Sequence, residues 1–119
     1  PALLVAVMVT LHSNATADSL IAPGAELETI STEFQLADGP AWDGSSLWFP
    51  DVKSGKLFRY SPKSGKLTVA VDAIGRISAS FYNHGKLYLS DNGASSIAWL
   101  QGNQKITIGE PRTWSNAKH

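Results

Sequence analysis

Short apolar stretches of four to eight residues alternate with turn-forming residues along most of the chain. The stretches are rich in β-branched and aromatic residues, and Gly, Asp, Asn, Ser or Pro bounds each of them, as in hairpin meanders. No segment has a sustained helical period. The pattern predicts an all-β fold with strands at residues 27–34, 46–49, 57–61, 66–71, 76–82, 86–90, 97–101 and 104–108.

Two of the predicted turns share one sequence. Segments 53–57 and 63–67 both read KSGKL, with the strand residues LFRYS between them. The Ser-Gly pair in each turn supplies the positive φ that two-residue hairpins need. We therefore expect consecutive antiparallel strands joined by tight turns.

The strands repeat along the chain with a period of about forty residues. Segment 47–51 (LWFPD) aligns with segment 87–91 (LYLSD), and the same offset pairs Trp42 with Tyr82 and Leu57 with Ile97. Four short strands in such a period are the signature of a β-propeller blade. Propellers contain roughly four to eight blades, whereas this chain accounts for about two. We expect it to be the N-terminal part of a longer propeller, because two blades alone leave an apolar face and strand edges uncovered.

Composition and charge exclude few classes of protein. Apolar residues make up 43% and charged residues 17% of the chain, as in an ordinary globular domain, and the formal net charge is zero. The basic residues begin at Lys53 and stand singly beside turn glycines, not in a basic run with stacking aromatics. This pattern argues against a nucleic-acid partner. Since the chain has no cysteine, its stability must come from packing or from a metal.

Residues 1–17 have the features of a signal-peptide remnant. Segment 1–11 (PALLVAVMVTL) is apolar but too short for a membrane span, which needs about twenty residues. Ala15-Thr16-Ala17 has the small-x-small form of a secretory cleavage site. We assign residues 1–17 to the signal and 18–119 to the propeller, and expect a secreted or periplasmic protein with no membrane attachment after cleavage. The alternative, a buried first strand, conflicts with the abrupt change to HSNATADS.

Familiar catalytic signatures are absent from the sequence. It contains no G-x-S-x-G elbow, Walker loop, G-x-G-x-x-G or H-E-x-x-H. His12 lies in the presumed signal, His119 ends the chain, and His84 stands in an Asn-His-Gly turn where we expect it to be exposed.

Repeated or bulky residues in the strands receive structural interpretations. Asp51 and Asp91 occupy matching strand ends, where a carboxylate most economically bonds amides of the following turn. The tryptophans are expected mostly to pack between sheets; they are Trp42, Trp48, Trp99 and Trp114.

Asp38 has two interpretations. Asp38-Gly39-Pro40 is locally what a tight turn uses. The repeat, however, places Asp38 before the first complete blade strand, close to an axial channel where carboxylates from several blades can converge. Hard cations such as calcium bind oxygen ligands of this kind. The residues alone leave both interpretations open.

Segments 36–66 (LADGPAWDGSSLWFPDVKSGKLFRYSPKSGK) and 85–100 (GKLYLSDNGASSIAWL) resemble the opening blades of the SMP-30/gluconolactonase/luciferin-regenerating-enzyme family of six-bladed propellers. The likeness covers residues 34–108 and includes the family's E-G-P-x-W-D start, with Asp38 in place of the glutamate. That glutamate ligates a single divalent metal in the family. The resemblance therefore implies Asp38 as a metal ligand, shorter by one methylene, with calcium as the expected ion and zinc as the alternative.

The resemblance also implies an activity, the metal-dependent hydrolysis of sugar lactones. In such a reaction the metal acts as a Lewis acid and a carboxylate moves the proton. The family's other ligands, an Asn and an Asp, and its R-x-N-x-P-N-D stretch lie in later blades. We therefore assign no catalytic or cofactor-binding residue within this chain and expect it to be inactive alone. The alternatives are a non-catalytic propeller that binds proteins or glycans, in which D-G-P is only a turn, and a truncated product without function.

Overall fold

The computed structural model describes residues 20–109, which belong to two units divided between Ile30 and Ser31. The presumed signal (residues 1–17), His12, Trp114 and His119 lie outside the described residues. Among residues 20–109 no helix is long and apolar enough to cross a membrane.

The predicted strand at residues 27–34 is wrong, because these residues form no strand. In the described part of the first unit, residues 20–30, every residue is exposed. Leu27 is 105% and Ile30 44% exposed, so neither has the covered apolar side that a strand needs. Within residues 20–30 the Ala25 amide donates to the Ala22 carbonyl at 3.0 Å and closes a turn.

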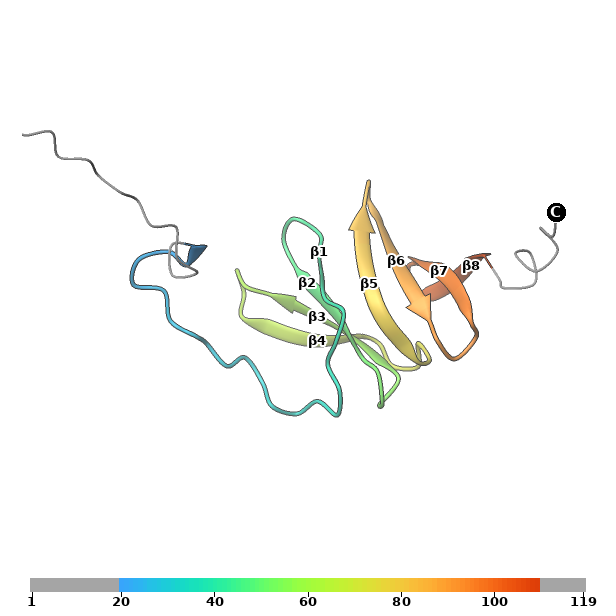
Figure 1. Ribbon diagram of the computed structural model, residues 1–119, viewed down its shortest axis with the longest axis horizontal. Coiled ribbons are helices and arrows are strands. Elements are labelled where there is room, and N and C mark those ends of the chain that lie inside the picture. The colour runs from blue at the N-terminus through green and yellow to red at the C-terminus, as the bar shows by residue number, and fades with distance from the viewer. Residues whose placement is uncertain (1–19, 110–119) are drawn as a thin grey trace, which may run out of the picture. The chain divides into compact units, whose positions relative to one another are not determined.

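The described part of the second unit, residues 31–109, is all-β, as predicted, with two antiparallel four-stranded sheets (Figure 1). Each sheet is a meander in which sequence neighbours pair. The first sheet contains β1 (Ala41–Trp42), β2 (Leu47–Asp51), β3 (Lys56–Ser61) and β4 (Lys66–Val71). The second contains β5 (Ile77–Asn83), β6 (Lys86–Asp91), β7 (Ser96–Gln101) and β8 (Gln104–Gly109). Strands β2 to β8 confirm the predicted ones within two residues at each end, whereas the two-residue β1 was not predicted.

The sequence repeat is also a repeat of strand register. The pair Trp42↔Leu47 in the first sheet recurs as Tyr82↔Leu87 in the second, forty residues on. A β-bulge between Leu57 and Phe58, where β3 pairs with β4, recurs between residues 97 and 98, where β7 pairs with β8. Each sheet is therefore one copy of the repeat.

The turn glycines have the predicted backbone conformation but in longer loops. Gly55 and Gly65 have φ of 71° and 68°. Each closes a loop of four residues between paired strand ends, so the expected two-residue turns are wrong at these places. A two-residue turn occurs instead at His84-Gly85, with φ of 46° and 80°, and His84 is exposed as predicted.

The core of the second unit lies between its two sheets. Leu57 from the first sheet and Ile77 and Leu89 from the second are at most 1% exposed. The other buried members of the cluster are Ala41, Ile74 and Leu87, and Trp48, Val71, Tyr82 and Leu100 pack against them. Burial of these apolar side chains provides the main driving force for packing the sheets together.

The tryptophans do not all pack between the sheets. Trp48 does, and its ring also lies 5.1 Å from the guanidinium of Arg59. Trp42 is 52% exposed, so the packing interpretation is wrong for it. Trp99 is half-buried on the other face of the second sheet, with Lys86 Nζ 4.6 Å from its ring centre.

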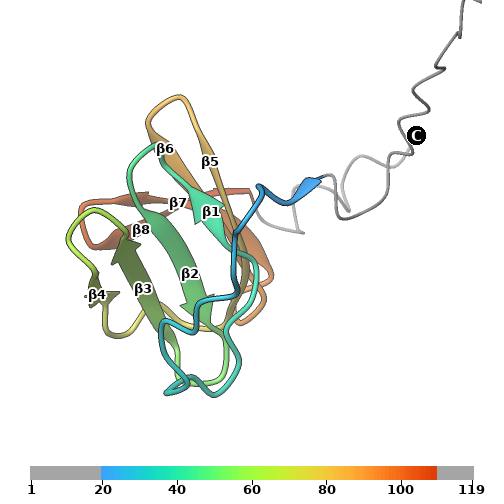
Figure 2. The same cartoon turned by 90° about the vertical axis from the view of Figure 1, so that its left-hand side faces the viewer.

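Gly39 makes a close backbone contact with the second sheet. It lies two residues before β1, which contacts both β2 and β5 (Figure 2). The Gly39 carbonyl accepts hydrogen bonds from the Ser80 amide at 2.9 Å and the Ser80 hydroxyl at 2.5 Å. With φ of 52°, a Cβ on Gly39 would lie 2.4 Å from Ala79 Cα and 2.7 Å from the Ser78 carbonyl oxygen. Only glycine fits at this position.

We predict that Gly39→Ala lowers the free energy of unfolding by about 3–5 kcal/mol, from left-handed backbone strain together with the backbone clash. Gly65→Ala is the matched control, because Gly65 also has positive φ but no atom within 4 Å of its added Cβ. This control should cost about 1–2 kcal/mol from strain alone. Urea unfolding of both variants measures the difference, and equal losses would contradict the close contact.

Candidate functional site

Asp38 lies in an extended segment just before β1. Its amide donates to the Pro50 carbonyl at 3.2 Å, next to an antiparallel bridge between Ala37 and Asp51. Its carboxylate Oδ1 accepts a hydrogen bond from the Gly39 amide at 2.8 Å, and its side chain is exposed. Residues 38–40 form no hydrogen-bonded turn, so the predicted tight turn is wrong, and the bond from the Gly39 amide orients one carboxylate oxygen.

The second oxygen of Asp38 remains available for a ligand. No hydrogen bond from residues 20–109 reaches its Oδ2. Within the same residues no group of three or more His, Cys, Asp or Glu side chains comes together to hold a metal. Calcium takes about six to eight oxygen ligands and zinc about four ligands. The described chain thus offers one candidate ligand, and the others would have to come from outside it.

The repeat places Ser78 of β5 at the position equivalent to Asp38, since 78 − 38 = 40. The Ser78 hydroxyl donates to the Ser90 hydroxyl at 3.4 Å. Because Gly39 contacts Ala79, the two equivalent positions adjoin the same contact between the sheets. The first sheet therefore has a carboxylate at this junction and the second a hydroxyl.

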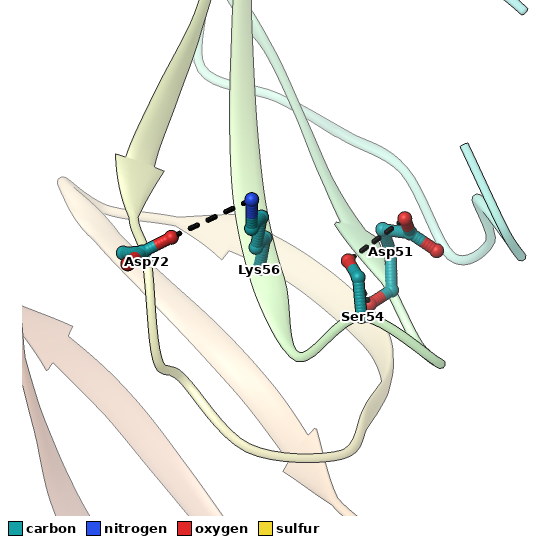
Figure 3. A network of polar contacts seen from close by, with 4 residues as sticks. All are labelled: Asp51, Ser54, Lys56 and Asp72. Atoms are coloured by element: carbon teal, nitrogen blue, oxygen red, sulfur yellow. Dashed lines mark hydrogen bonds and ion pairs between the residues drawn. The ribbon is translucent and has the colours of Figure 1, made fainter. Parts of the chain in front are cut away.

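Asp51 is a structural carboxylate. It is 2% exposed and accepts hydrogen bonds from the Leu36 amide at 2.7 Å and the Gln35 amide at 3.1 Å. It also accepts one from the Ser54 hydroxyl at 2.8 Å (Figure 3). Burial raises its pKa, but these hydrogen bonds outweigh burial and hold the pKa below its usual value. Asp51 thereby ties the segment before β1 to the β2–β3 loop.

Asp91 has the corresponding role in the second sheet. It is 4% exposed, accepts a hydrogen bond from the Ala94 amide at 3.1 Å and pairs with Lys105 Nζ at 2.5 Å. Burial raises its pKa, and the Lys105 ammonium and Ala94 amide lower it to below the usual value. The predicted bonding to the following turn is confirmed for Asp91. For Asp51 the following turn contributes the Ser54 hydroxyl, while Gln35 and Leu36 add amides from the preceding segment.

Asp43 organises the β1–β2 turn, a role that the sequence interpretation did not assign. Its Oδ1 accepts from the Ser46 amide at 2.7 Å and the Ser45 amide at 2.8 Å, and its Oδ2 accepts from Trp48 Nε1 at 2.7 Å. Burial raises its pKa, but the hydrogen bond from Trp48 and those from the two serines bring it down to about 2. The Asp-Gly-Ser-Ser sequence, a usual Asx-turn composition, is the signal that could have indicated this role.

A hollow of about 460 Å³ lies between the β2–β3 loop and the connection from β4 to β5. Lys53 and Arg76 bring positive charge to its lining, while Asp38 is not among the lining residues. At the same end of the first sheet, Lys56 and Asp72 form an exposed ion pair at 3.7 Å (Figure 3). The remaining lining residues are Val52, Ser54, Gly55 and Gly75. The hollow and the candidate metal ligand are therefore separate features.

A comparison with models of known protein families found no match for this chain. Support for a function therefore comes from the motif residues and from the geometry around Asp38.

We predict that Asp43 makes stability pH-dependent in acid. Its folded pKa of about 2 lies below the unfolded value, so its stabilising contribution is present above about pH 4 and is lost as the pH falls toward 2. Asp43→Asn should lower the urea midpoint at pH 7 and flatten its decline between about pH 5 and pH 2. Asp72→Asn is the control, because an exposed ion pair contributes little. An unchanged pH profile in Asp43→Asn would show that its hydrogen bonds do not stabilise the fold.

Proposed function

We propose that this chain forms the first two blades of a six-bladed β-propeller of the gluconolactonase type, and that the complete protein hydrolyses sugar lactones with one divalent metal ion. Two consecutive four-stranded meanders with equivalent registers and an equivalent bulge support the propeller assignment. The likeness of residues 34–108 to the family's opening blades supports the activity.

The observation that carries the proposal is the position of Asp38. The first strands of the two sheets, β1 and β5, lie against each other, and Asp38 stands at the start of this contact with one carboxylate oxygen available. In a propeller the first strand of each blade lines the central channel, so carboxylates of other blades would approach Asp38 there. A ligand in this place is what a metal centre shared among blades requires.

Within this chain each residue near Asp38 has a definite part. Asp38 would bind the metal through Oδ2, while its Oδ1 stays on the Gly39 amide. The Ser80 bonds to the Gly39 carbonyl would keep the Asp38 backbone in place. Calcium suits such an oxygen ligand, and zinc is the alternative. When bound, the metal would polarise the lactone carbonyl and orient a water molecule.

The coding sequence beyond His119 provides the first test. The proposal requires further repeats of about forty residues that carry an Asn ligand, an Asp ligand and an R-x-N-x-P-N-D element. If these repeats are absent, this chain is a non-catalytic propeller module or a truncated product without function. An exported product, found in the periplasm or the medium, is expected from the leader at residues 1–17.

The second test uses Asp38→Asn in the polypeptide that includes those further repeats. Asn keeps an oxygen that can accept from the Gly39 amide, so folding stability should change by less than about 0.5 kcal/mol. Loss of the charge should weaken calcium binding roughly tenfold or more, because affinity follows ligand charge. Aldonolactone hydrolysis should fall with it, while Asp72→Asn, a control at an exposed carboxylate, retains both. Unchanged calcium binding and hydrolysis in Asp38→Asn would leave Asp38 with only its structural bond to the Gly39 amide.

A further inference from the structure

The hollow of about 460 Å³ between the β2–β3 loop and the connection from β4 to β5, here called the basic hollow, has a polar lining. Lys53 comes from the loop and Arg76 from the connection, so two cations on different segments border one space. Val52 is the one apolar side chain among the lining residues, and it is 7% exposed. The volume lies within the range of small-molecule sites, about 300–1,000 Å³. This lining suits a polar ligand and not an apolar one.

The two cations of the basic hollow have no partner in the described chain. Within residues 20–109 neither Lys53 nor Arg76 forms an ion pair. Arg76 lies close to a carboxylate without pairing with it, because a Cβ on Gly93 would be 3.5 Å from Arg76 Cβ and 3.4 Å from Asp91 Oδ1. Asp91 pairs with Lys105 Nζ at 2.5 Å instead. The guanidinium of Arg76 therefore keeps its donors for a ligand.

The acidic side chains at this end of the first sheet are also engaged elsewhere. Asp51 is 2% exposed, and two backbone amides and the Ser54 hydroxyl bond its oxygens. Asp72 pairs with Lys56 at 3.7 Å (Figure 3). No carboxylate is among the residues that line the basic hollow. An anion that enters it meets two cations and no acidic side chain in the lining.

Two glycines leave bare backbone between the cations. Gly55 and Gly75 have φ of 71° and 93°, and a Cβ on Gly55 would lie 3.7 Å from the Gly75 carbonyl oxygen and 4.0 Å from its nitrogen. The Ile74 amide donates to the Gly55 carbonyl at 2.8 Å and so holds the two segments at this separation. The Gly75 amide itself donates to no acceptor within residues 20–109. An unpaired amide beside two cations is a further donor for an oxyanion.

We infer that the basic hollow binds a small polar molecule through a phosphate or carboxylate group. The planar guanidinium of Arg76 would hold two oxygens of the group side by side, and the Lys53 ammonium would add a second charge from the facing loop. The Gly75 amide would donate to the same group. Since Asp38 is not in the lining, this binding depends on neither the proposed metal nor lactone hydrolysis.

Isothermal titration calorimetry of this chain at low salt tests the inference. Glucose 6-phosphate and glucuronate present a phosphate and a carboxylate on a sugar, and glucose is the uncharged control. We expect saturable binding at one site for at least one of the two acids, and none for glucose. Inorganic phosphate should bind more weakly than the acid that binds. An equal dissociation constant for inorganic phosphate would overturn the assignment to a larger molecule.

Glutamine variants test the residues. Lys53→Gln and Arg76→Gln should each raise the dissociation constant at least about tenfold, through loss of a charge-assisted contact, and should fold because both residues are exposed. Lys63→Gln is the matched control, because segments 53–57 and 63–67 share the sequence KSGKL, Lys63 is also exposed, and it does not line the basic hollow. It should bind like the parent chain. Equal losses in Lys53→Gln and Lys63→Gln, or no saturable binding at all, would overturn the inference, whatever the outcome of the lactonase test.

Discussion

The backbone of Gly39 touches Ala79 and Ser80 of β5, and the packing of the two sheets depends on this contact. A side chain at Gly39 would push the first strands apart and open the core in which Leu57 and Ile77 are buried. The same contact determines where Asp38 lies, because Asp38 is one residue away and its carboxylate bonds the Gly39 amide. The packing of the sheets and the position of the candidate ligand Asp38 thus both depend on the contact that Gly39 makes with β5.

Apart from Asp72, which forms an exposed ion pair with Lys56, the aspartates of residues 31–109 have two kinds of environment. Asp43, Asp51 and Asp91 accept hydrogen bonds from nearby amides, hydroxyls, an indole or an ammonium, and their pKa values are lowered as a result. Their carboxylate oxygens already accept hydrogen bonds within the chain and hold turns and strand ends in place. Asp38 is exposed and has one oxygen that residues 20–109 leave without a hydrogen bond. This contrast distinguishes a carboxylate available for a ligand from carboxylates that belong to the scaffold.

Sequence periodicity predicts the strands and turns that repeat along the chain, but not the elements that lack a repeat. It located β2 to β8 and the repeat, since alternating side chains and turn glycines mark them directly. It could not locate β1, because the two residues between Pro40 and Asp43 are too few to show a period. It wrongly predicted a strand at 27–34, because apolar alternation does not reveal whether a partner strand exists. The contact of Gly39 with Ala79 joins residues forty apart and leaves no local pattern. For the proposed metal site the sequence offers one residue, Asp38, since a site that several blades would share cannot be predicted from one of them.

The bulges in the two sheets show how closely the backbone repeats. One lies at Leu57/Phe58 and the other at Ile97/Ala98, and the paired outer strands contribute different residues in the two copies, Val69 and Val71 in one, Thr107 and Gly109 in the other. A backbone irregularity at the same point of both units, opposite different side chains, shows that the path of the main chain repeats more closely than the sequence does.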